Sequence, residues 1–262
     1  MNKVDFRVAL PNFITLLGLC LGLTSMKLAF EGNFEKSIIF IVIAAILDAL
    51  DGRIARLIKG TSKFGAELDS LTDFVNFGVC PSLIIYFWSL YNFEFYGWII
   101  SLLFVSACCL RLARFNISTF ASNEKITWRE NFFSGVPAPA GAGLILMPMI
   151  VTFSDFNIFF NEYLSSSLIL IIVLLTSFLM ISKIPTYAMK KIKISKNSFV
   201  LLSLSLVIFF GLLFNKTFET LTFVGFIYFF SIPISFFHFL KVKKIKEKNI
   251  KKGDSLISDE II

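Results

Sequence analysis

The sequence predicts an all-α integral membrane protein with about eight transmembrane helices and with both termini in the cytoplasm. Of the 262 residues, 56% are hydrophobic and 33 are Phe, and the mean hydropathy is +0.79. These values are too high for a water-soluble fold of this size. Apolar runs long enough to cross a bilayer as helices, about 20 residues each, occur eight times along the chain. The composition therefore excludes a soluble domain, and no nucleic acid is expected as a partner.

The eight expected helices have short connections, except for a loop at about 119–136. Their approximate limits are 8–30, 36–58, 65–90, 96–118, 137–154, 166–186, 197–214 and 218–240. The first run is a full span without an A-x-A-like cleavage site, so we interpret it as a retained helix and not as a signal peptide. We expect one membrane domain, with a core of six helices over 1–193, an appended helix pair over 194–240 and a disordered charged tail over 241–262. We interpret the appended pair as scaffold or dimer surface.

The distribution of Lys and Arg predicts the orientation of these helices. Of the 25 basic residues, only Lys27, Lys36 and Lys216 lie on the side where helices 1 and 7 end, and the other 22 lie on the opposite side. Because basic residues favour cytoplasmic loops, both termini are predicted to be cytoplasmic. The lysines of the tail are expected to rest on anionic membrane lipids.

The positions of the cysteines and of the single histidine match neither a metal site nor a catalytic triad. Cys20, Cys80, Cys108 and Cys109 lie in apolar runs without metal-ligand spacing, so we interpret them as buried structural residues. His238 lies at the far end of the last helix, where we expect an interfacial side chain. Catalysis by Ser-His-Asp or by a phosphohistidine therefore lacks a suitable partner.

Four aspartates interrupt the second and third expected helices at fixed intervals. The pattern reads Asp48-x2-Asp51-Gly52-x2-Ala55-Arg56-x8-Gly65-x3-Asp69-x3-Asp73. Spacings of three and four residues place each aspartate pair on one helix face, and a connection of about six residues makes the two helices antiparallel neighbours. The pairs therefore converge near the cytoplasmic interface. Ionised Asp in a membrane span costs a few kcal/mol or more, so the cluster needs a compensating cation.

Oxygen-only ligands favour Mg²⁺ or Mn²⁺ over zinc. Two such ions about 4 Å apart would form the clamp that is used for displacement at phosphorus, and one aspartate could act as the base. Gly52, Ala55 and Gly65 extend the acidic faces at four-residue offsets, which indicates close approach by a ligand or, alternatively, a tight helix crossing. An ion-coupled transporter and a structural subunit remain alternatives to an enzyme at this point.

The pattern resembles the signature of the CDP-alcohol phosphatidyltransferase family at every fixed position. Members of that family displace CMP from a CDP-linked lipid by attack of an alcohol. The resemblance implies that the four aspartates hold the metals, with Asp73 also acting as general base. It implies that the nucleotide is bordered by Gly52, Ala55, Arg56 and Gly65. Asn12 and Thr15 follow Pro11 in a string that family members share, so either could touch the nucleotide, although helix capping is their default role.

Four further strings resemble the CDP-diacylglycerol:serine branch of this family. They cover 56–75, 110–116, 135–140 and 178–184. The resemblance implies CDP-diacylglycerol and L-serine as substrates and phosphatidylserine as product, with glycerol 3-phosphate, inositol phosphate or choline as alternative acceptors. It also implies a homodimer in a bacterial inner membrane with its active site at the cytoplasmic side.

Two arginines are candidates for anion binding. Arg111 and Arg114 lie three residues apart at the cytoplasmic end of the fourth helix. One guanidinium could pair with the lipid phosphate and the other with the serine carboxylate, or both could anchor the helix at the interface. Asn116 and Lys183 could add polar contacts to the acceptor or the lipid phosphate, although Lys183 could equally be an interface anchor.

Overall fold

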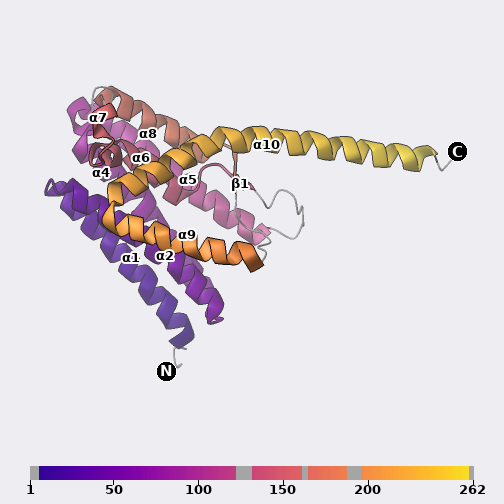
Figure 1. Ribbon diagram of the computed structural model, residues 1–262, viewed down its shortest axis with the longest axis horizontal. Helices are drawn as coiled ribbons and strands as arrows, with labels where there is room; N and C mark the ends of the chain where they lie inside the picture. Colours follow the sequence, from indigo (N-terminus) through magenta and orange to yellow (C-terminus); the bar gives the residue numbers. More distant parts are fainter. Residues whose placement is uncertain (1–5, 122–131, 161–164, 188–195, 260–262) are drawn as a thin grey trace.

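The structure is a computed structural model that describes residues 6–121, 132–160, 165–187 and 196–259, and nearly all of this part is helical (Figure 1). The elements in chain order are α1 (Phe6–Phe30), α2 (Phe34–Leu57), α3 (Lys63–Asp73), the π-helix η1 (Phe74–Val79), α4 (Cys80–Trp88), the 3₁₀-helix η2 (Leu90–Phe93), α5 (Glu94–Ala121), β1 (Phe132–Ser134), α6 (Ala138–Thr152), α7 (Asn157–Phe160), α8 (Ser166–Ile181), β2 (Pro185–Tyr187), α9 (Lys196–Asn215) and α10 (Thr217–Asp259).

Each of the eight expected segments contains a helix, but the structure corrects one end. The helix expected over 166–186 ends at Ile181, and β2 follows it. β2 pairs antiparallel with β1, with Phe133 opposite Thr186, so the fold is not purely α. Strands of three residues are too short to leave an alternating pattern in the sequence. The paired strands hold the chain before α6 against the chain after α8, beside the middle of α10, where Ser235 donates to the carbonyl of Pro185.

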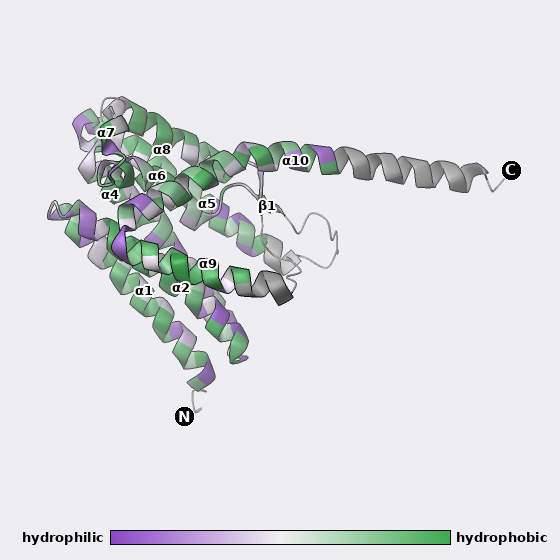
Figure 2. Ribbon diagram, viewed as in Figure 1, coloured by the Kyte–Doolittle hydropathy of each residue, from purple (hydrophilic) through white to green (hydrophobic). Residues whose placement is uncertain are grey.

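Four helical runs are long and apolar enough to cross a membrane: Phe6–Phe30, Lys63–Trp88, Leu90–Ile117 and Thr217–Val242. Shorter apolar helices cover Ala138–Thr152, Ser166–Ile181 and Ser203–Asn215. Figure 2 shows apolar residues over most of the bundle and hydrophilic residues at one end of α1 and α2. This is the arrangement expected of a helical membrane protein whose polar end meets water.

The buried face of α1 is built from small residues. It repeats every three or four positions as Pro11, Thr15, Gly18, Gly22, Ser25 and Ala29. Small side chains let helix backbones approach closely, and α1 packs along α2, α3 and α4 on this face. The hydroxyl of Ser25 adds a polar tie, since it donates to the carbonyl of Ser37 at 2.7 Å.

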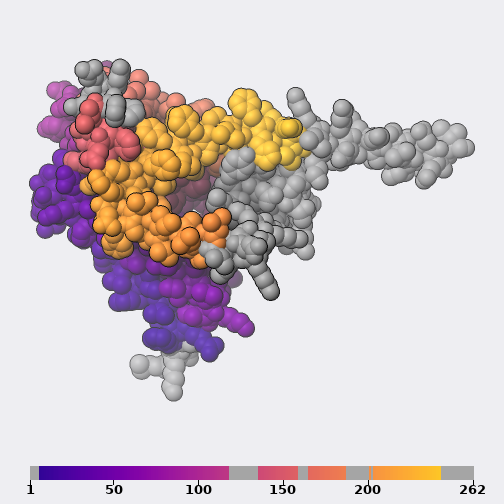
Figure 3. Space-filling model, in the orientation of Figure 1, coloured from indigo at the N-terminus to yellow at the C-terminus, as the bar shows by residue number. Residues whose placement is uncertain are grey.

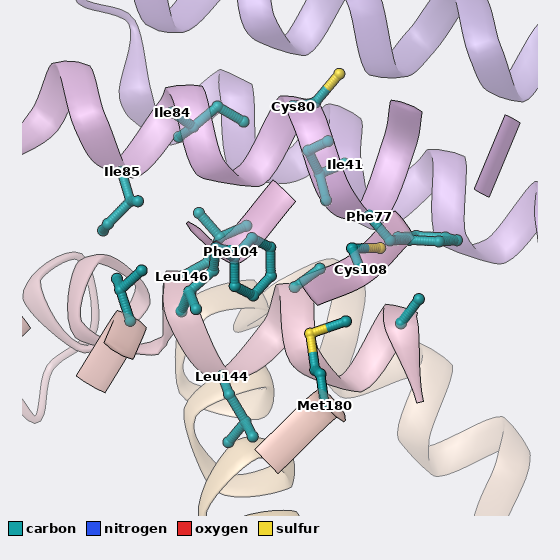
Figure 4. Close-up of a cluster of buried hydrophobic side chains, with 14 of the residues drawn as sticks. Ile41, Phe77, Cys80, Ile84, Ile85, Phe104, Cys108, Leu144, Leu146 and Met180 are labelled. Carbon is teal, nitrogen blue, oxygen red and sulfur yellow. The ribbon is translucent and has the colours of Figure 1, made fainter. Parts of the chain in front are cut away.

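The apolar core lies behind the acidic helices. Figure 4 shows side chains of the η1–α4 run, α5, α6 and α8 meeting there: Phe77, Cys80, Ile84, Ile85, Phe104, Cys108, Leu144, Leu146 and Met180. Cys80 and Cys108 are buried as predicted, whereas Cys20 and Cys109 are exposed on the outer surface of their helices. That part of the prediction was wrong, because helices in lipid carry apolar residues outward as well as inward.

A π-helix follows directly on Asp73. Residues 74–79 form η1, and the run continues into α4 without a break. One extra residue per turn is accommodated here, as is common where a helix passes a functional site.

The appended helices lie across one face of the core (Figure 3). α10 packs on α6, β2 and α9. It continues to Asp259, so the structure differs from the expectation of a disordered tail after residue 240. Lys and Glu, which are frequent after Leu240, are good helix formers, and a charged helix shows no apolar periodicity that would predict it.

A tight turn joins α2 to α3. Lys59 adopts a left-handed conformation (φ 55°), and the amide of Gly60 donates to the carbonyl of Ala55 at 2.8 Å. This is a helix-ending Schellman motif in which Lys59 takes the place that Gly usually fills. It returns the chain at once, so that α3 runs antiparallel to α2, as the sequence predicted.

The turn tolerates no side chain at residue 60, because a Cβ there would collide with the backbone carbonyl of Arg7 at the start of α1. Replacing Gly60 with Ala is expected to reduce the free energy of unfolding by about 1–3 kcal/mol. Thermal unfolding in detergent measures this. Gly32→Ala is unsuitable as a control because Gly32 has a positive φ, whereas Gly211→Ala adds a methyl group into open space. A Gly60→Ala protein as stable as the Gly211→Ala protein would contradict the close contact.

Candidate active site

Three carboxylates converge between α2 and α3. Asp48, Asp51 and Asp69 each offer one oxygen, and these oxygens lie within 4.8 Å of one another. Asp51 is buried, with only 2% of its surface exposed, and the other two are half-buried. Like charges this close repel, so a divalent cation would relieve the repulsion and fits this all-oxygen ligand set.

Asp73 extends this group toward the core. Its carboxyl lies within hydrogen-bonding reach of the carboxyl of Asp48, and it also interacts electrostatically with Asp69. One of its oxygens, Oδ1, is buried and has no hydrogen-bond partner among the described residues. Asp73 therefore stands beside the three converging carboxylates, with an acceptor oxygen unused.

A cavity of ≈ 460 Å³ opens beside the acidic group on the side of α1. Asp51 and Asp69 form one wall. The rest is lined by α1, the end of α2, the turn and the start of α3: Pro11, Asn12, Thr15, Gly52, Ala55, Arg56, Gly60, Thr61, Ser62, Gly65 and Ala66. All six residues that the sequence associated with the nucleotide lie in this lining.

Gly52, Gly65 and Thr15 each shape the cavity or the acidic group in a specific way. A Cβ on Gly52 would enter open space, so its absence leaves room in the cavity. A Cβ on Gly65 would lie 2.8 Å from Oδ1 of Asn12, so glycine lets α3 approach α1. The hydroxyl of Thr15 lies 2.5 Å from Oδ2 of Asp51 and 3.0 Å from the carbonyl oxygen of Pro11, so its one proton can be donated to the carboxylate. Thr15 thus fixes the orientation of one carboxylate, a role that the sequence did not indicate.

The turn supplies residues that sequence reasoning missed. Ser62 caps α3 by accepting from the amide of Gly65 at 2.9 Å, and Gly60, Thr61 and Ala66 line the cavity next to it. A Ser three residues before a Gly that opens an acidic helix is an N-cap pattern, and this signal was available in the sequence.

The two arginines of α5 differ in their surroundings. Arg114 donates to the carbonyl of Ile181 at 2.7 Å and lies 3.4 Å from the carbonyls of Met180 and Ser182, so it caps the end of α8. Arg111 instead lies close to Asp73, and its Nε is buried without a hydrogen-bond partner among the described residues. The structure therefore brings Arg111, more than Arg114, to the acidic group.

Asn116 and Lys183, the other two residues predicted to contact the acceptor, are not part of the acidic group or of the cavity lining. Asn116 exchanges hydrogen bonds with the hydroxyl of Ser70, at 3.1 and 3.3 Å, which joins α5 to α3 one residue after Asp69. Lys183 is exposed between α8 and β2. His238 is exposed on α10. The roles of Asn116 and Lys183 toward a substrate stay predictions.

Residues 8–179 match the CDP-alcohol phosphatidyltransferase family, and the chain belongs to that family. It is similar to the CDP-diacylglycerol--serine O-phosphatidyltransferase of Helicobacter pylori, with 40% identity over 240 residues, 91% of this chain and 95% of the relative. The protein of the same name from Mycobacterium bovis is 43% identical over 144 residues, 53% of this chain and 50% of the relative. Archaetidylserine synthase of Methanothermobacter thermautotrophicus is 33% identical over 190 residues, 70% of this chain and 71% of the relative. These findings confirm the resemblance to the family.

Gly52 offers a test of the cavity. Gly52→Ala is expected to raise the free energy of unfolding by up to about 1 kcal/mol, because Ala is a better helix former. It should weaken binding of CDP by roughly 5- to 100-fold, because the methyl group takes space from the ligand. Thermal unfolding and calorimetric titration with CDP measure the two effects. The matched Gly211→Ala change, on α9 in open space, should stabilise without altering CDP binding. Unchanged CDP affinity in Gly52→Ala would remove Gly52 from the nucleotide site.

Proposed function

We propose that this protein transfers the phosphatidyl group of CDP-diacylglycerol to the hydroxyl of L-serine, giving phosphatidylserine and CMP. The observation that carries the proposal is the juxtaposition of three converging carboxylates, a half-buried Asp73 with one buried oxygen, and a cavity large enough for a nucleotide. Family membership supports the reaction type, and the Helicobacter pylori relative, similar over nearly its whole length, supports serine as the acceptor.

The cavity is the place for the cytidine nucleotide. Arg56, which is exposed at its edge, attracts the charge of Asp69 and can also meet a phosphate oxygen. Asp48, Asp51 and Asp69 would hold a divalent cation, Mg²⁺ or Mn²⁺, and the two-ion arrangement implied by the family also belongs to this proposal. A cation bound there supplies neutralisation of the charge that develops on the diphosphate as CMP leaves.

Asp73 is the proposed general base. It would accept the proton of the serine hydroxyl as the serine oxygen forms a bond to the lipid-side phosphorus. The bond from that phosphorus to the oxygen of CMP breaks at the same time, and CMP leaves with the electron pair. The unused oxygen of Asp73 and its position beside Asp48 fit this role, while a share in metal binding by Asp73 remains part of the proposal.

The membrane arrangement is also a proposal. Eight crossings with both termini in the cytoplasm would place the acidic group near the cytoplasmic face of a bacterial inner membrane. The uneven distribution of Lys and Arg supports this orientation. A homodimer is proposed from the family resemblance, and its interface is not assigned.

The decisive experiment is to measure CMP release from CDP-diacylglycerol by the purified protein with Mn²⁺ or Mg²⁺. Serine, glycerol 3-phosphate, inositol 1-phosphate and choline are compared as acceptors. Release that depends on serine supports the proposal. Release with another acceptor instead would keep the reaction type and overturn serine. Metal-dependent cation flux without any CMP release would favour a transporter.

A further inference from the structure

A row of buried polar atoms leads away from Asp73 toward α10. Oδ1 of Asp73, Nε of Arg111 and the hydroxyl of Tyr228 have no hydrogen-bond partner within the described part of the chain. Arg111 interacts electrostatically with both Asp73 and Tyr228. Leaving a buried polar group unpaired costs about 1–3 kcal/mol, and native proteins rarely accumulate such groups in one place. The row is therefore suited to a polar ligand.

Tyr228 is held in this position by packing on both sides along α10. At the start of the helix, Lys216 pairs with Asp155 at 2.9 Å. Seven residues after Tyr228, Ser235 donates to the carbonyl of Pro185 on β2 at 2.9 Å. Gly225, one turn before Tyr228, lies so close to the side chain of Met147 on α6 that a Cβ would collide with it. These contacts hold the part of α10 that carries Tyr228 against the core.

The neighbour of the phenol leaves its proton available. The hydroxyl of Thr186, on β2, lies next to the Tyr228 hydroxyl, but it donates its own proton to the carbonyl of Gly135 at 2.9 Å. Thr186 can therefore only accept from Tyr228, and the described residues form no hydrogen bond with the Tyr228 hydroxyl. The phenol proton can be donated to a ligand, and Arg111 supplies a positive charge beside it.

The position of Arg111 and Tyr228 relative to the nucleotide cavity indicates which substrate they could bind. The nucleotide cavity borders Asp51 and Asp69 and is lined by α1, whereas Arg111 and Tyr228 interact with each other near Asp73, and none of these three residues lines the cavity. In an in-line displacement the attacking group enters opposite the leaving group. An acceptor held by Arg111 and Tyr228 would enter beside Asp73 and outside the nucleotide cavity, as such a displacement requires. A guanidinium and a phenol that both donate are suited to a carboxylate.

We propose that Tyr228 and Arg111 bind the carboxylate of the acceptor amino acid while Asp73 receives the proton of its hydroxyl. Tyr228 then determines specificity for an acceptor with a carboxylate. The inference rests on the proposed function. It changes the interpretation of the appended helices, because Tyr228 lies beyond the residues 8–179 that match the family. The helix that carries it was expected to be only scaffold or dimer surface.

The test is Tyr228→Phe, which removes the hydroxyl and keeps the ring. The KM for serine is expected to rise about 10-fold or more, as for loss of a hydrogen bond to a charged group, with the KM for CDP-diacylglycerol unchanged. Tyr91→Phe, on the exposed tyrosine of η2, is the matched control and should change neither value. A larger KM for CDP-diacylglycerol with an unaltered KM for serine would assign the phenol to the lipid phosphate and overturn the inference.

Competition experiments separate binding from damage to the fold. Serinamide, which lacks the carboxylate charge, and serine are compared as competing acceptors in both proteins. Wild-type preference for serine should shrink in Tyr228→Phe by the same factor as the rise in KM. Equal weakening for both compounds would indicate a structural effect and overturn the inference. Wild-type protein without serine-dependent CMP release would overturn the proposed function as well, whereas active wild type with unchanged Tyr228→Phe overturns this inference alone.

Discussion

Replacing Asp73 with Asn is expected to reduce the rate of CMP release about 100- to 10,000-fold, the range that a general base contributes. Binding of CDP-diacylglycerol in the presence of Mn²⁺ should persist. The reason is geometric, because Asp48, Asp51 and Asp69 converge without Asp73 and the nucleotide cavity does not include it. Single-turnover CMP release and equilibrium binding of the CDP-lipid measure the two quantities separately.

The matched control is Asp155→Asn. Asp155 lies on the loop after α6, where it pairs with Lys216, and this pair lies outside the acidic group. The neighbouring Lys216 lowers the pKa of Asp155 below its ordinary value, so the carboxylate stays charged at neutral pH and Asp155→Asn removes a charge outside the acidic group. If Asp73→Asn lost lipid binding together with turnover, Asp73 would be a ligand that holds the site together and not the base.

Removing divalent cations is expected to abolish serine-dependent CMP release, by about 1,000-fold or more, since metal stabilisation of a displacement is worth several kcal/mol. Adding Mn²⁺ should also stabilise the fold, because binding relieves repulsion between three carboxylates within 4.8 Å of one another. At a concentration of 100 times the dissociation constant the gain is about 2.7 kcal/mol. Thermal unfolding with and without Mn²⁺ checks this independently of activity.

Asp69→Asn sharpens the metal prediction. It removes one of the three converging charges and should remove most of the Mn²⁺-dependent rise in melting temperature, while Asp155→Asn should keep it. The protein without metal should become slightly more stable in Asp69→Asn, because the repulsion is smaller. A full Mn²⁺ response in Asp69→Asn would place the cation elsewhere on the chain.

The acidic group and its cavity could be predicted from the sequence because they depend on local spacing. Asp48 and Asp51 share a helix face, as do Asp69 and Asp73, and the short connection leaves only an antiparallel pairing. The offsets of Gly52, Ala55 and Gly65 indicated close approach by a ligand or a helix, and the family resemblance implied that the ligand is the nucleotide. The family comparison confirms that the chain belongs to the family, and the structure brings these residues together around one cavity.

Other features could not be predicted because they depend on which distant segments meet. Arg111 and Arg114 are equivalent by spacing, and only the position of the α8 end gives Arg114 three carbonyl oxygens to contact. Tyr228 is one aromatic residue among many in a Phe-rich helix. Its proposed role in acceptor binding depends on its contact with β2. The β1–β2 pair has only three residues in each strand, too few to give an alternating pattern in the sequence.

The π-helix after Asp73 determines how the side chains of α4 are oriented relative to those of α3 in one continuous helix. Each residue in an α-helix turns the direction of the side chains by about 100°. Through the extra residue of η1, the run can present Asp69 and Asp73 to the acidic group and then Phe77, Cys80 and Ile84 to the apolar core. If all six residues 74–79 were wound as regular α-helix, α4 would be rotated by about that angle relative to α3. A change that leaves every aspartate in place would thus disconnect the chemistry from the packing that supports it.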